Sequence, residues 1–358
     1  MDREYTTELQ KIEASLNKTL PQTPDASWWV KMFPNISPRP ELARELLEPG
    51  LDLFSRGGKR WRPLLAHLIC QALGGGDAAI PLLGLVEFPH NASLIHDDLE
   101  DESTERRGKA AIHLLYGNDT AINSGSFLYF LPFMDLENWN GEPQAQIRIW
   151  KLYAAHLRLL HLGQSMDIAW HRDPAFTPSL EDYMLMCGLK TGCLARFAAL
   201  LGAEIAGAVQ NTIPDESLTA SLGEAAQKLG VGFQILDDVK NLSTGIPGKT
   251  RGDDVVEGKK SLPVLLFLHG SGTGPDAGVK RIQRAEFVSR CFMAAKAGGA
   301  TVPEVEALAG ALEEAGILAE AERQGKALIN QAGAFFSELP AENAGAKKLL
   351  TGLTERLL

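Results

Sequence analysis

The sequence predicts an all-α protein, and two observations support this fold class. From about residue 41 onward, apolar residues recur at spacings of three and four, the period of a helix with one buried face. Short breaks rich in glycine, proline and asparagine interrupt this pattern, and we find no convincing run of alternating strand residues. We therefore expect roughly ten or more helices.

The chain of 358 residues is long enough for one large domain or two ordinary ones. Residues 4–19 have helical spacing, whereas residues 20–40 contain five prolines and are expected to form an irregular connector. We predict that residues 1–40 pack on a single all-α domain that spans residues 41–358.

The balance of charge argues against a nucleic-acid surface. The net charge is −10, whereas proteins that bind nucleic acids usually present a basic surface. Lysines and arginines nevertheless cluster at Lys59 to Arg62, Arg106 and Arg107, Lys249 to Arg251, and Lys259 and Lys260. Basic clusters on an acidic chain favour local anion sites, although ordinary surface charge is the simpler interpretation of any one cluster.

The four cysteines have no CxxC spacing and lie in apolar surroundings, which predicts buried thiols in a reducing compartment. The N-terminal residues are polar and lack the apolar stretch of a signal peptide. We find no apolar run of the ~18 residues that a membrane-spanning helix needs. We expect a cytoplasmic protein without a membrane span.

A first acidic motif lies in the segment His96 to Asp101. Asp97 and Asp101 are four residues apart, so in a helix they share one face. Two carboxylates in that position repel each other by a few tenths of a kcal/mol, a cost that a cation between them would offset. Carboxylate oxygens suit Mg²⁺. The alternative is an acidic helix face exposed to solvent.

A second carboxylate pair, Asp237 and Asp238, lies far downstream in a segment that also reads as a helix. Here the residue four positions after Asp237 is Asn241, whose amide oxygen carries no charge. The nearby run Gly248-Lys249-Thr250 suggests a P-loop, but that motif needs an earlier glycine where this chain has Ser243, and a strand upstream. We therefore reject the P-loop interpretation.

Basic motifs accompany both acidic helices. The glycines of the run Gly57 to Pro63 allow backbone and side chains to close on an anion, and Lys and Arg both bind phosphate. Motifs spread over some two hundred residues can meet only inside a bundle whose central helices face one another. Together they favour a site in which about three Mg²⁺ ions bridge the acidic helices to a diphosphate, with apolar helix walls sheltering a hydrocarbon.

This set of motifs resembles the trans-isoprenyl diphosphate synthases, the polyprenyl synthetase family. The resemblance runs from about residue 40 to the C-terminus and rests on GGKRWRP at 57–63, HNASLIHDDLEDESTERRG at 90–108, KTG at 190–192, FQILDDVKN at 233–241 and GKTRGDDVVEGKKSLP at 248–263. It implies an all-α isoprenoid synthase bundle with a central cavity, usually a homodimer. The implied reaction is a Mg²⁺-dependent head-to-tail condensation of isopentenyl diphosphate with an allylic diphosphate, dimethylallyl, geranyl or farnesyl, which releases pyrophosphate.

The resemblance also implies roles for individual residues. Asp97 and Asp101 would bind two Mg²⁺ ions, Asp237 would bind a third, and Asp98 and Asp238 would support them. The implied isopentenyl diphosphate site is Lys59, Arg62, His90 and Arg107. The implied allylic diphosphate site is Arg106, Lys190, Thr191, Gln234, Lys249 and Lys259, of which Lys190 and Lys249 are also predicted to act in catalysis. The family often has a third Asp where this chain has Asn241, which puts a metal role for Asn241 in doubt.

Product length is expected to depend on the residues four and five positions before Asp97, which help to form the floor of the product pocket in this family. Here they are Ser93 and Ala92, both small. Because one helical turn rises ~5.4 Å, small residues at this turn should admit at least one more isoprene unit. We predict a product of twenty carbons or longer. Phe88 is a candidate floor one turn further back, in competition with Phe127, Tyr129 and Phe130.

Three alternatives stay open. A terpene cyclase shares the fold class but needs no isopentenyl diphosphate site, against which the GGKRWRP run and the Arg106-Arg107 pair argue. A farnesyl diphosphate synthase would make a shorter product. A non-catalytic subunit of a heteromeric synthase usually lacks one acidic motif, whereas this chain has both.

Overall fold

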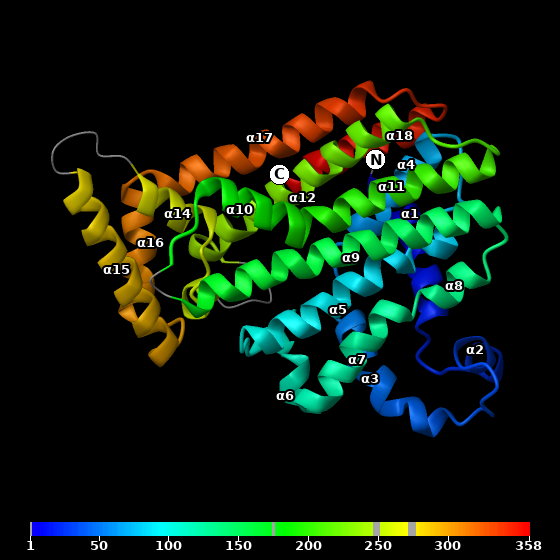
Figure 1. Ribbon diagram of the computed structural model, residues 1–358, viewed down its shortest axis with the longest axis horizontal. Helices are drawn as coiled ribbons and strands as arrows, with labels where there is room; N and C mark the ends of the chain where they lie inside the picture. The colour runs from blue at the N-terminus through cyan, green and yellow to red at the C-terminus, as the bar shows by residue number, and fades with distance from the viewer. Residues whose placement is uncertain (1, 174–175, 246–250, 271–276) are drawn as a thin grey trace.

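The computed structural model describes residues 2–173, 176–245, 251–270 and 277–358. It confirms the predicted all-α class, because helices make up almost all of the regular structure in these ranges (Figure 1). The helices are α1 (Asp2–Thr19), α2 (Ala26–Met32), η1 (Pro40–Ala43), α3 (Arg44–Ser55), α4 (Trp61–Ala72), η2 (Ile80–Leu82), α5 (Gly84–Glu100), α6 (Ile112–Tyr116), α7 (Asn118–Phe130), α8 (Phe133–Glu137), α9 (Pro143–Arg172), α10 (Leu180–Cys187), η3 (Gly188–Gly192), α11 (Cys193–Val209), α12 (Glu216–Leu242), α13 (Asp253–Glu257), α14 (Leu262–His269), α15 (Ala277–Gly298), α16 (Pro303–Glu314), α17 (Ile317–Glu338) and α18 (Ala344–Leu357).

The N-terminal segment contains one helix more than its sequence suggests. Residues 20–40 include α2, which begins where the Asp25 side chain accepts a hydrogen bond from the Trp28 backbone N–H at 2.7 Å. Trp28 and Trp29 are buried, and the Trp28 indole donates to the Thr19 carbonyl at 2.8 Å. The five prolines therefore border a short capped helix whose tryptophans attach it to the body.

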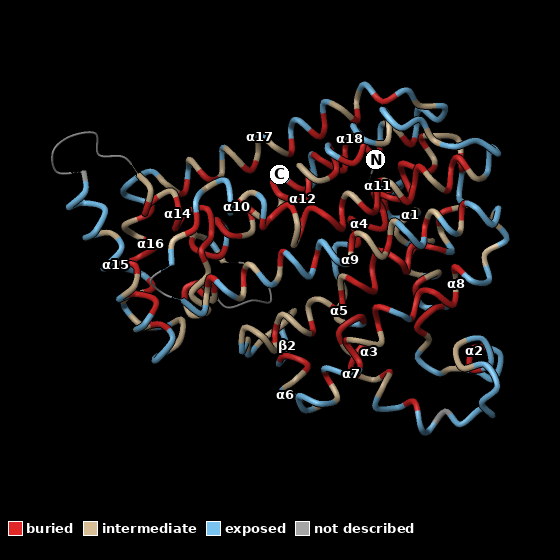
Figure 2. Tube along the Cα trace, in the orientation of Figure 1, coloured by how far each residue is buried: buried red, intermediate tan, exposed pale blue. Residues whose placement is uncertain are grey.

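The centre of the bundle is formed by helices that are apolar around most of their circumference. α11 packs between α4, α9 and α12, and α12 also lies along α17. Figure 2 shows α11 and α12 largely buried, whereas α15 exposes much of its length. A second large hydrophobic core is formed largely by α13–α16, and α12 contributes buried residues to both large cores.

Among the described residues, one segment is long and apolar enough to cross a membrane by length and composition, namely Leu180–Val209. It comprises α10, η3 and α11, and 78% of its most apolar window is buried inside the protein. The segment is therefore the central helix of the bundle. Its apolar character reflects burial on all sides.

A short hairpin follows the first acidic helix. Strands β1 (Glu105–Arg106) and β2 (Lys109–Ala110) pair antiparallel, with Arg106 opposite Lys109. The turn contains Arg107 and Gly108 in left-handed conformations, with φ of 52° and 74°. Arg106, at the end of β1 just before this turn, contacts Asp98 near the carboxyl end of α5.

Candidate active site

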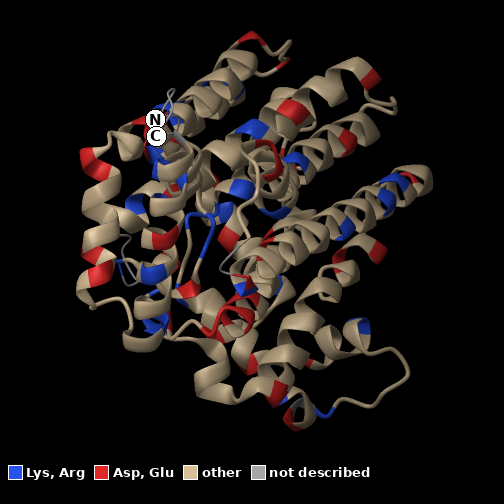
Figure 3. Cartoon of the chain, turned by 60° about the vertical axis from the view of Figure 1, so that its left-hand side comes forward, with Lys and Arg blue, Asp and Glu red and all other residues tan. Residues whose placement is uncertain are grey.

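A cavity of about 720 Å³ opens between α4, α5, α9, η3 and α12, in the range usual for small-molecule sites. Acidic and basic positions meet in this interior region of the bundle (Figure 3). Of the residues predicted from the sequence, the cavity is lined by Lys59, Arg62, His90, Ser93, Asp97, Arg106, Arg107, Lys190, Thr191, Gln234, Asp237, Asp238 and Lys259.

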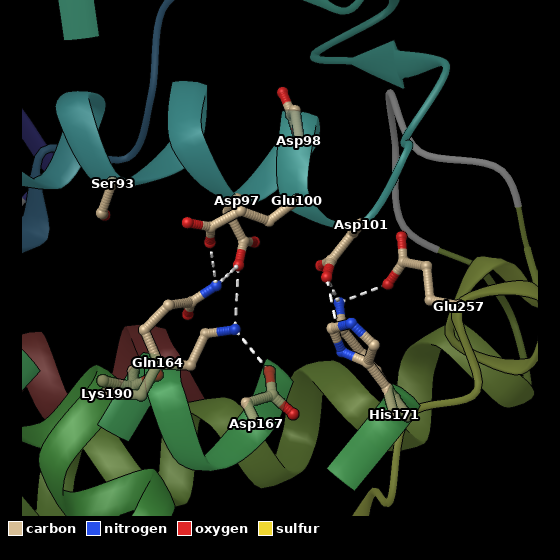
Figure 4. A network of polar contacts seen from close by, with 12 residues as sticks. Ser93, Asp97, Asp98, Glu100, Asp101, Gln164, Asp167, His171, Lys190 and Glu257 are labelled. Atoms are coloured by element: carbon tan, nitrogen blue, oxygen red, sulfur yellow. Dashed lines mark hydrogen bonds and ion pairs between the residues drawn. The ribbon is translucent and has the colours of Figure 1, made fainter. Parts of the chain in front are cut away.

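Asp97 faces α9 and η3 across the cavity (Figure 4). Its Oδ1 accepts from Lys190 Nζ and Gln164 Nε2, both at 2.9 Å. The same ammonium donates to Asp167 Oδ2 at 2.6 Å. Burial alone would raise the pKa of Asp97, but the charges of Lys190, Lys259 and Arg106 lower it well below its usual value, so Asp97 stays ionised.

Asp101 lies just behind the cavity wall, and its surroundings suit a cation. Both of its carboxylate oxygens are buried and accept no hydrogen bond from the residues that the structure describes. Lys259 Nζ and His171 Nδ1 lie 3.4 and 3.7 Å away. Burial and the neighbouring charge of Asp97 raise the pKa of Asp101 to about 7. Unsatisfied oxygens beside a second carboxylate are the donor set that a hard divalent cation fits.

Asp98 faces away from Asp97 toward the hairpin. It is fully buried, and its Oδ1 accepts from the Arg106 guanidinium, with 2.8 Å to Nε. Burial raises the pKa of Asp98, while the Arg106 charge opposes that rise. The pair ties the hairpin to the acidic end of α5, which suits a supporting role for Asp98.

The second acidic motif faces the same cavity from α12. Asp237 lines it, and its charge acts on Lys59 across the cavity. Asp238 is more deeply buried: its two oxygens accept from Gln234 Nε2 and from the Tyr183 hydroxyl, each at 2.8 Å. Gln234 Oε1 in turn accepts from Thr191 Oγ1 at 3.0 Å.

The side chains expected to bind isopentenyl diphosphate line the cavity from three places: the start of α4 and the residues just before it, α5, and the turn between β1 and β2. Arg62 Nη1 lies 3.4 Å from His90 Nε2, and Lys59 Nζ sits 4.6 Å from the centre of the Phe233 ring. Burial, followed by the charges of Arg62 and Arg107, lowers the pKa of His90 well below its usual value. A neutral His90 can therefore donate or accept a hydrogen bond within a cationic ring.

Two predicted positions need separate comment. Lys249 lies outside the described residues. Asn241 is buried and does not line the cavity, because its Oδ1 faces the Asp254 backbone N–H at 3.4 Å. Asn241 therefore fixes the start of α13 rather than facing the carboxylates.

The three residues expected at the floor of the product pocket lie in different surroundings in the structure. Ser93 lines the cavity, one turn before Asp97. Ala92 is fully buried outside the lining, and Phe88 is packed in the core against Phe54, with ring centroids 5.9 Å apart. Pro89 does not turn Phe88 toward the cavity, and of these three residues only Ser93 lines it. Tyr129, one of the competing positions, also lines the cavity.

Sequence reasoning missed the contribution of α9. Gln164 and Asp167 line the cavity, and His171 lies near Asp101 one turn further along. The available signal was the spacing of three and four between these polar residues on one helix face. Glu257 on α13, which pairs with Lys259, was also missed.

Lys190 and Thr191 lie in η3, a π-helical turn inserted between α10 and α11. Two glycines let neighbouring helices approach this turn closely. A Cβ on Gly163 would lie 2.4 Å from the Lys190 backbone nitrogen, and one on Gly230 would lie 2.9 Å from the Gly192 Cα. The turn is therefore held between α9 and α12, with Lys190 bonded to the first acidic helix and Thr191 to the second.

Comparison with known proteins agrees with this fold. The family model for polyprenyl synthetase matches residues 43–286. Geranylfarnesyl diphosphate synthase of Aeropyrum pernix is 31% identical over 86% of this chain and 92% of that protein. Octaprenyl diphosphate synthase of Escherichia coli is 32% identical over 62% of this chain and 65% of that protein.

Solved structures give the same result. Geranylgeranyl pyrophosphate synthetase of Pyrococcus horikoshii superposes with a TM-score of 0.78 at 24% identity, over 98% of this chain and 95% of that one. A polyprenyl synthase of Caulobacter crescentus, complexed with calcium and isoprenyl diphosphate, gives a TM-score of 0.76 at 25% identity, over 99% and 95% of the two chains.

An all-α bundle with two acidic helices and a cationic ring around one cavity defines the class of prenyl diphosphate synthases. The chain belongs to the polyprenyl synthetase family, and it is a prenyltransferase.

Proposed function

We propose that this enzyme condenses isopentenyl diphosphate with an allylic diphosphate, head to tail, to give a trans-polyprenyl diphosphate of twenty carbons or longer. The observation that carries the proposal is the single cavity that collects Asp97 and Asp237 with the cations of four separate segments. Such a site can hold two diphosphates and stabilise the negative charge that develops as one of them leaves.

Different residues of the cavity would bind the two substrates. Lys59, Arg62, His90 and Arg107 would bind isopentenyl diphosphate, while Arg106, Lys190, Thr191, Gln234, Lys249 and Lys259 would bind the allylic diphosphate. The allylic C–O bond breaks and releases pyrophosphate, the isopentenyl double bond attacks the allylic cation, and a proton is then lost to an oxygen of the released pyrophosphate. Binding both substrates in one closed cavity supplies the orientation that the condensation needs.

Asp97, Asp101 and Asp237 would hold Mg²⁺, and the unsatisfied oxygens of Asp101 support this assignment. Three ions, the number that the family resemblance implies, would neutralise the diphosphate and polarise it as a leaving group. The calcium ion in the Caulobacter crescentus relative supports a divalent cation in the family. Lys190 and Lys259, which contact Asp97 and Asp101, would turn toward the diphosphate when a metal takes their place.

The proposed product length rests on the small Ser93 at the cavity wall. The relatives described above bear names that denote products of several lengths, so the final number of isoprene units is left to measurement. The four cysteines are buried and unpaired, which supports the reducing cytoplasm as the proposed location.

A homodimer is also part of the proposal. Large apolar side chains are exposed on adjacent helices α7 and α9: Phe130 is 66% exposed, Leu162 54% and Ile122 47%. Apolar surface of this kind is usually covered by another protein surface. A second copy of the chain is the partner that the family resemblance implies.

The direct test incubates the purified enzyme with Mg²⁺, isopentenyl diphosphate and, in turn, dimethylallyl, geranyl and farnesyl diphosphate. Mass spectrometry should detect elongated prenyl diphosphates, and EDTA should abolish their formation. Asp97→Ala and Asp237→Ala should each nearly eliminate turnover, whereas the matched surface variant Asp182→Ala should not. A cyclic hydrocarbon in place of a prenyl diphosphate would instead support the terpene cyclase alternative.

A further inference from the structure

A chain of hydrogen bonds runs from the interior of α10 to the cavity wall. The Tyr183 hydroxyl donates to Asp238 Oδ2, and Gln234 Nε2 donates to Asp238 Oδ1, each at 2.8 Å. Thr191 Oγ1 then donates to Gln234 Oε1 at 3.0 Å. Tyr183 is only 1% exposed and Asp238 6% exposed, so water competes little with these bonds.

The positions of the atoms give the direction of this chain. Gln234 Nε2 donates to Asp238 Oδ1 and Gln234 Oε1 accepts from Thr191 Oγ1, so the NH₂ group of the amide points inward. The amide oxygen is therefore the atom that faces Thr191. Thr191 donates its single hydroxyl proton to that oxygen. Its hydroxyl therefore presents lone pairs, and not a proton, to the cavity.

We propose that Tyr183 and Asp238 are positioning residues that orient the Gln234 amide, and through it the Thr191 hydroxyl, so that oxygen lone pairs face the allylic cation. The proposal rests on the proposed condensation, in which positive charge develops on the allylic carbon. Fixed dipoles aimed at developing charge lower the barrier without having to reorganise. With the amide reversed, Thr191 would accept from the NH₂ group and turn its proton toward the cation.

Tyr183 lines the cavity, but the hydrogen bond of its hydroxyl distinguishes this role from direct binding. Its hydroxyl is satisfied by Asp238, and Asp238 in turn has both oxygens occupied. Loss of the Tyr183 hydroxyl should therefore affect the charged transition state more than the affinity for either substrate.

The test is a double-mutant cycle between Tyr183 and Thr191, which do not bond to each other. Tyr183→Phe should lower kcat about tenfold with little change in KM, because one buried hydrogen bond is lost. Thr191→Val should lower kcat at least as much, and Thr191→Ser should restore it. In the Thr191→Val background, Tyr183→Phe should change kcat less than about twofold, since both act through one chain.

Tyr5→Phe is the matched control, because Tyr5 is a buried tyrosine that donates to the Leu349 carbonyl far from the cavity. Tyr5→Phe should lower the unfolding midpoint and leave kcat unchanged. Combined with Thr191→Val, it should leave the kcat of that variant unchanged as well. If Tyr183→Phe fails to fold, Asp238→Asn takes its place in the cycle and should show the same non-additivity.

Two kinds of failure are distinguishable. A wild-type enzyme that forms no elongated prenyl diphosphate would overturn both the proposed function and this inference. An active wild type in which Tyr183→Phe leaves kcat unchanged, raises only KM, or acts equally in both Thr191 backgrounds would overturn the inference alone.

Discussion

Lys190 Nζ lies 2.9 Å from Asp97 Oδ1, so a cation from the π-helical turn contacts the first acidic helix directly. The same ammonium is held by Asp167 at 2.6 Å. Asp97 is a proposed metal ligand, whereas Asp167 lies on α9 outside the predicted motifs. We infer that Asp167 keeps Lys190 in position when a metal ion draws Asp97 away.

Asp167→Asn should therefore weaken binding of the allylic diphosphate. Asparagine keeps the size of the side chain but loses the charge that holds Lys190, and we expect KM for the allylic substrate to rise roughly tenfold. Steady-state kinetics with each substrate varied in turn would measure this, and KM for isopentenyl diphosphate should change less.

The matched control for Asp167→Asn is Glu204→Gln. Glu204 also pairs with a cation on α9, Arg148, at 2.8 Å, but neither residue lines the cavity. An equal change of KM in both variants would show that the effect comes from general loss of charge and not from Lys190.

Ser93→Phe should shorten the product. Ser93 lines the cavity one turn before Asp97, so a phenyl ring there would occupy space needed by the growing chain. We expect the main product to lose at least one isoprene unit, because the ring fills about one 5.4 Å turn of the wall. Chromatography of the dephosphorylated products would measure the change.

The comparison variant is Ala92→Phe. Ala92 is fully buried in the core and does not line the cavity, so the larger side chain should overpack the core and cost about 1–3 kcal/mol of stability. If Ala92→Phe shortened the product while Ser93→Phe left it unchanged, the cavity wall described here would be wrong.

The all-α class could be predicted from the sequence because the apolar period of a helix is a local pattern. The one-turn spacing of Asp97 and Asp101 is local too, and their metal role stays a prediction. The sequence could not show that Ser93 lines the cavity and Ala92 does not. The side of α5 that faces the cavity depends on how α5 packs against α7 and α11. The bond between Tyr183 and Asp238 joins residues 55 positions apart, and the sequence carries no local sign of it.

Gly163→Ala should disturb the π-helical turn. The new Cβ would lie 2.4 Å from the Lys190 backbone nitrogen, so α9 and η3 must move apart. We expect a loss of about 1–3 kcal/mol in unfolding free energy together with a lower kcat, because Lys190 and Thr191 both move.

Gly310→Ala on α16 is the control: its Cβ meets open space, and the substitution should stabilise the helix by up to about 1 kcal/mol. Equal unfolding free energies for wild type and Gly163→Ala would contradict the close contact.

The stability of the fold should depend on pH through Asp135, which lies where α1 meets α8. The Thr19 hydroxyl, at the end of α1, donates to Asp135 on α8, and burial raises the pKa of Asp135 to about 6. Because the folded protein holds this proton more tightly than the unfolded chain, the stabilisation is complete below about pH 4 and is lost as the pH rises through about 6. Asp135→Asn cannot titrate, so the unfolding free energy of wild type relative to this variant should fall by at most about 1.4 kcal/mol per pH unit in that window. Urea unfolding of both proteins between pH 4.5 and 7.5 measures the difference. A difference that stays constant between pH 4.5 and 7.5 would contradict the raised pKa of the Asp135 carboxyl.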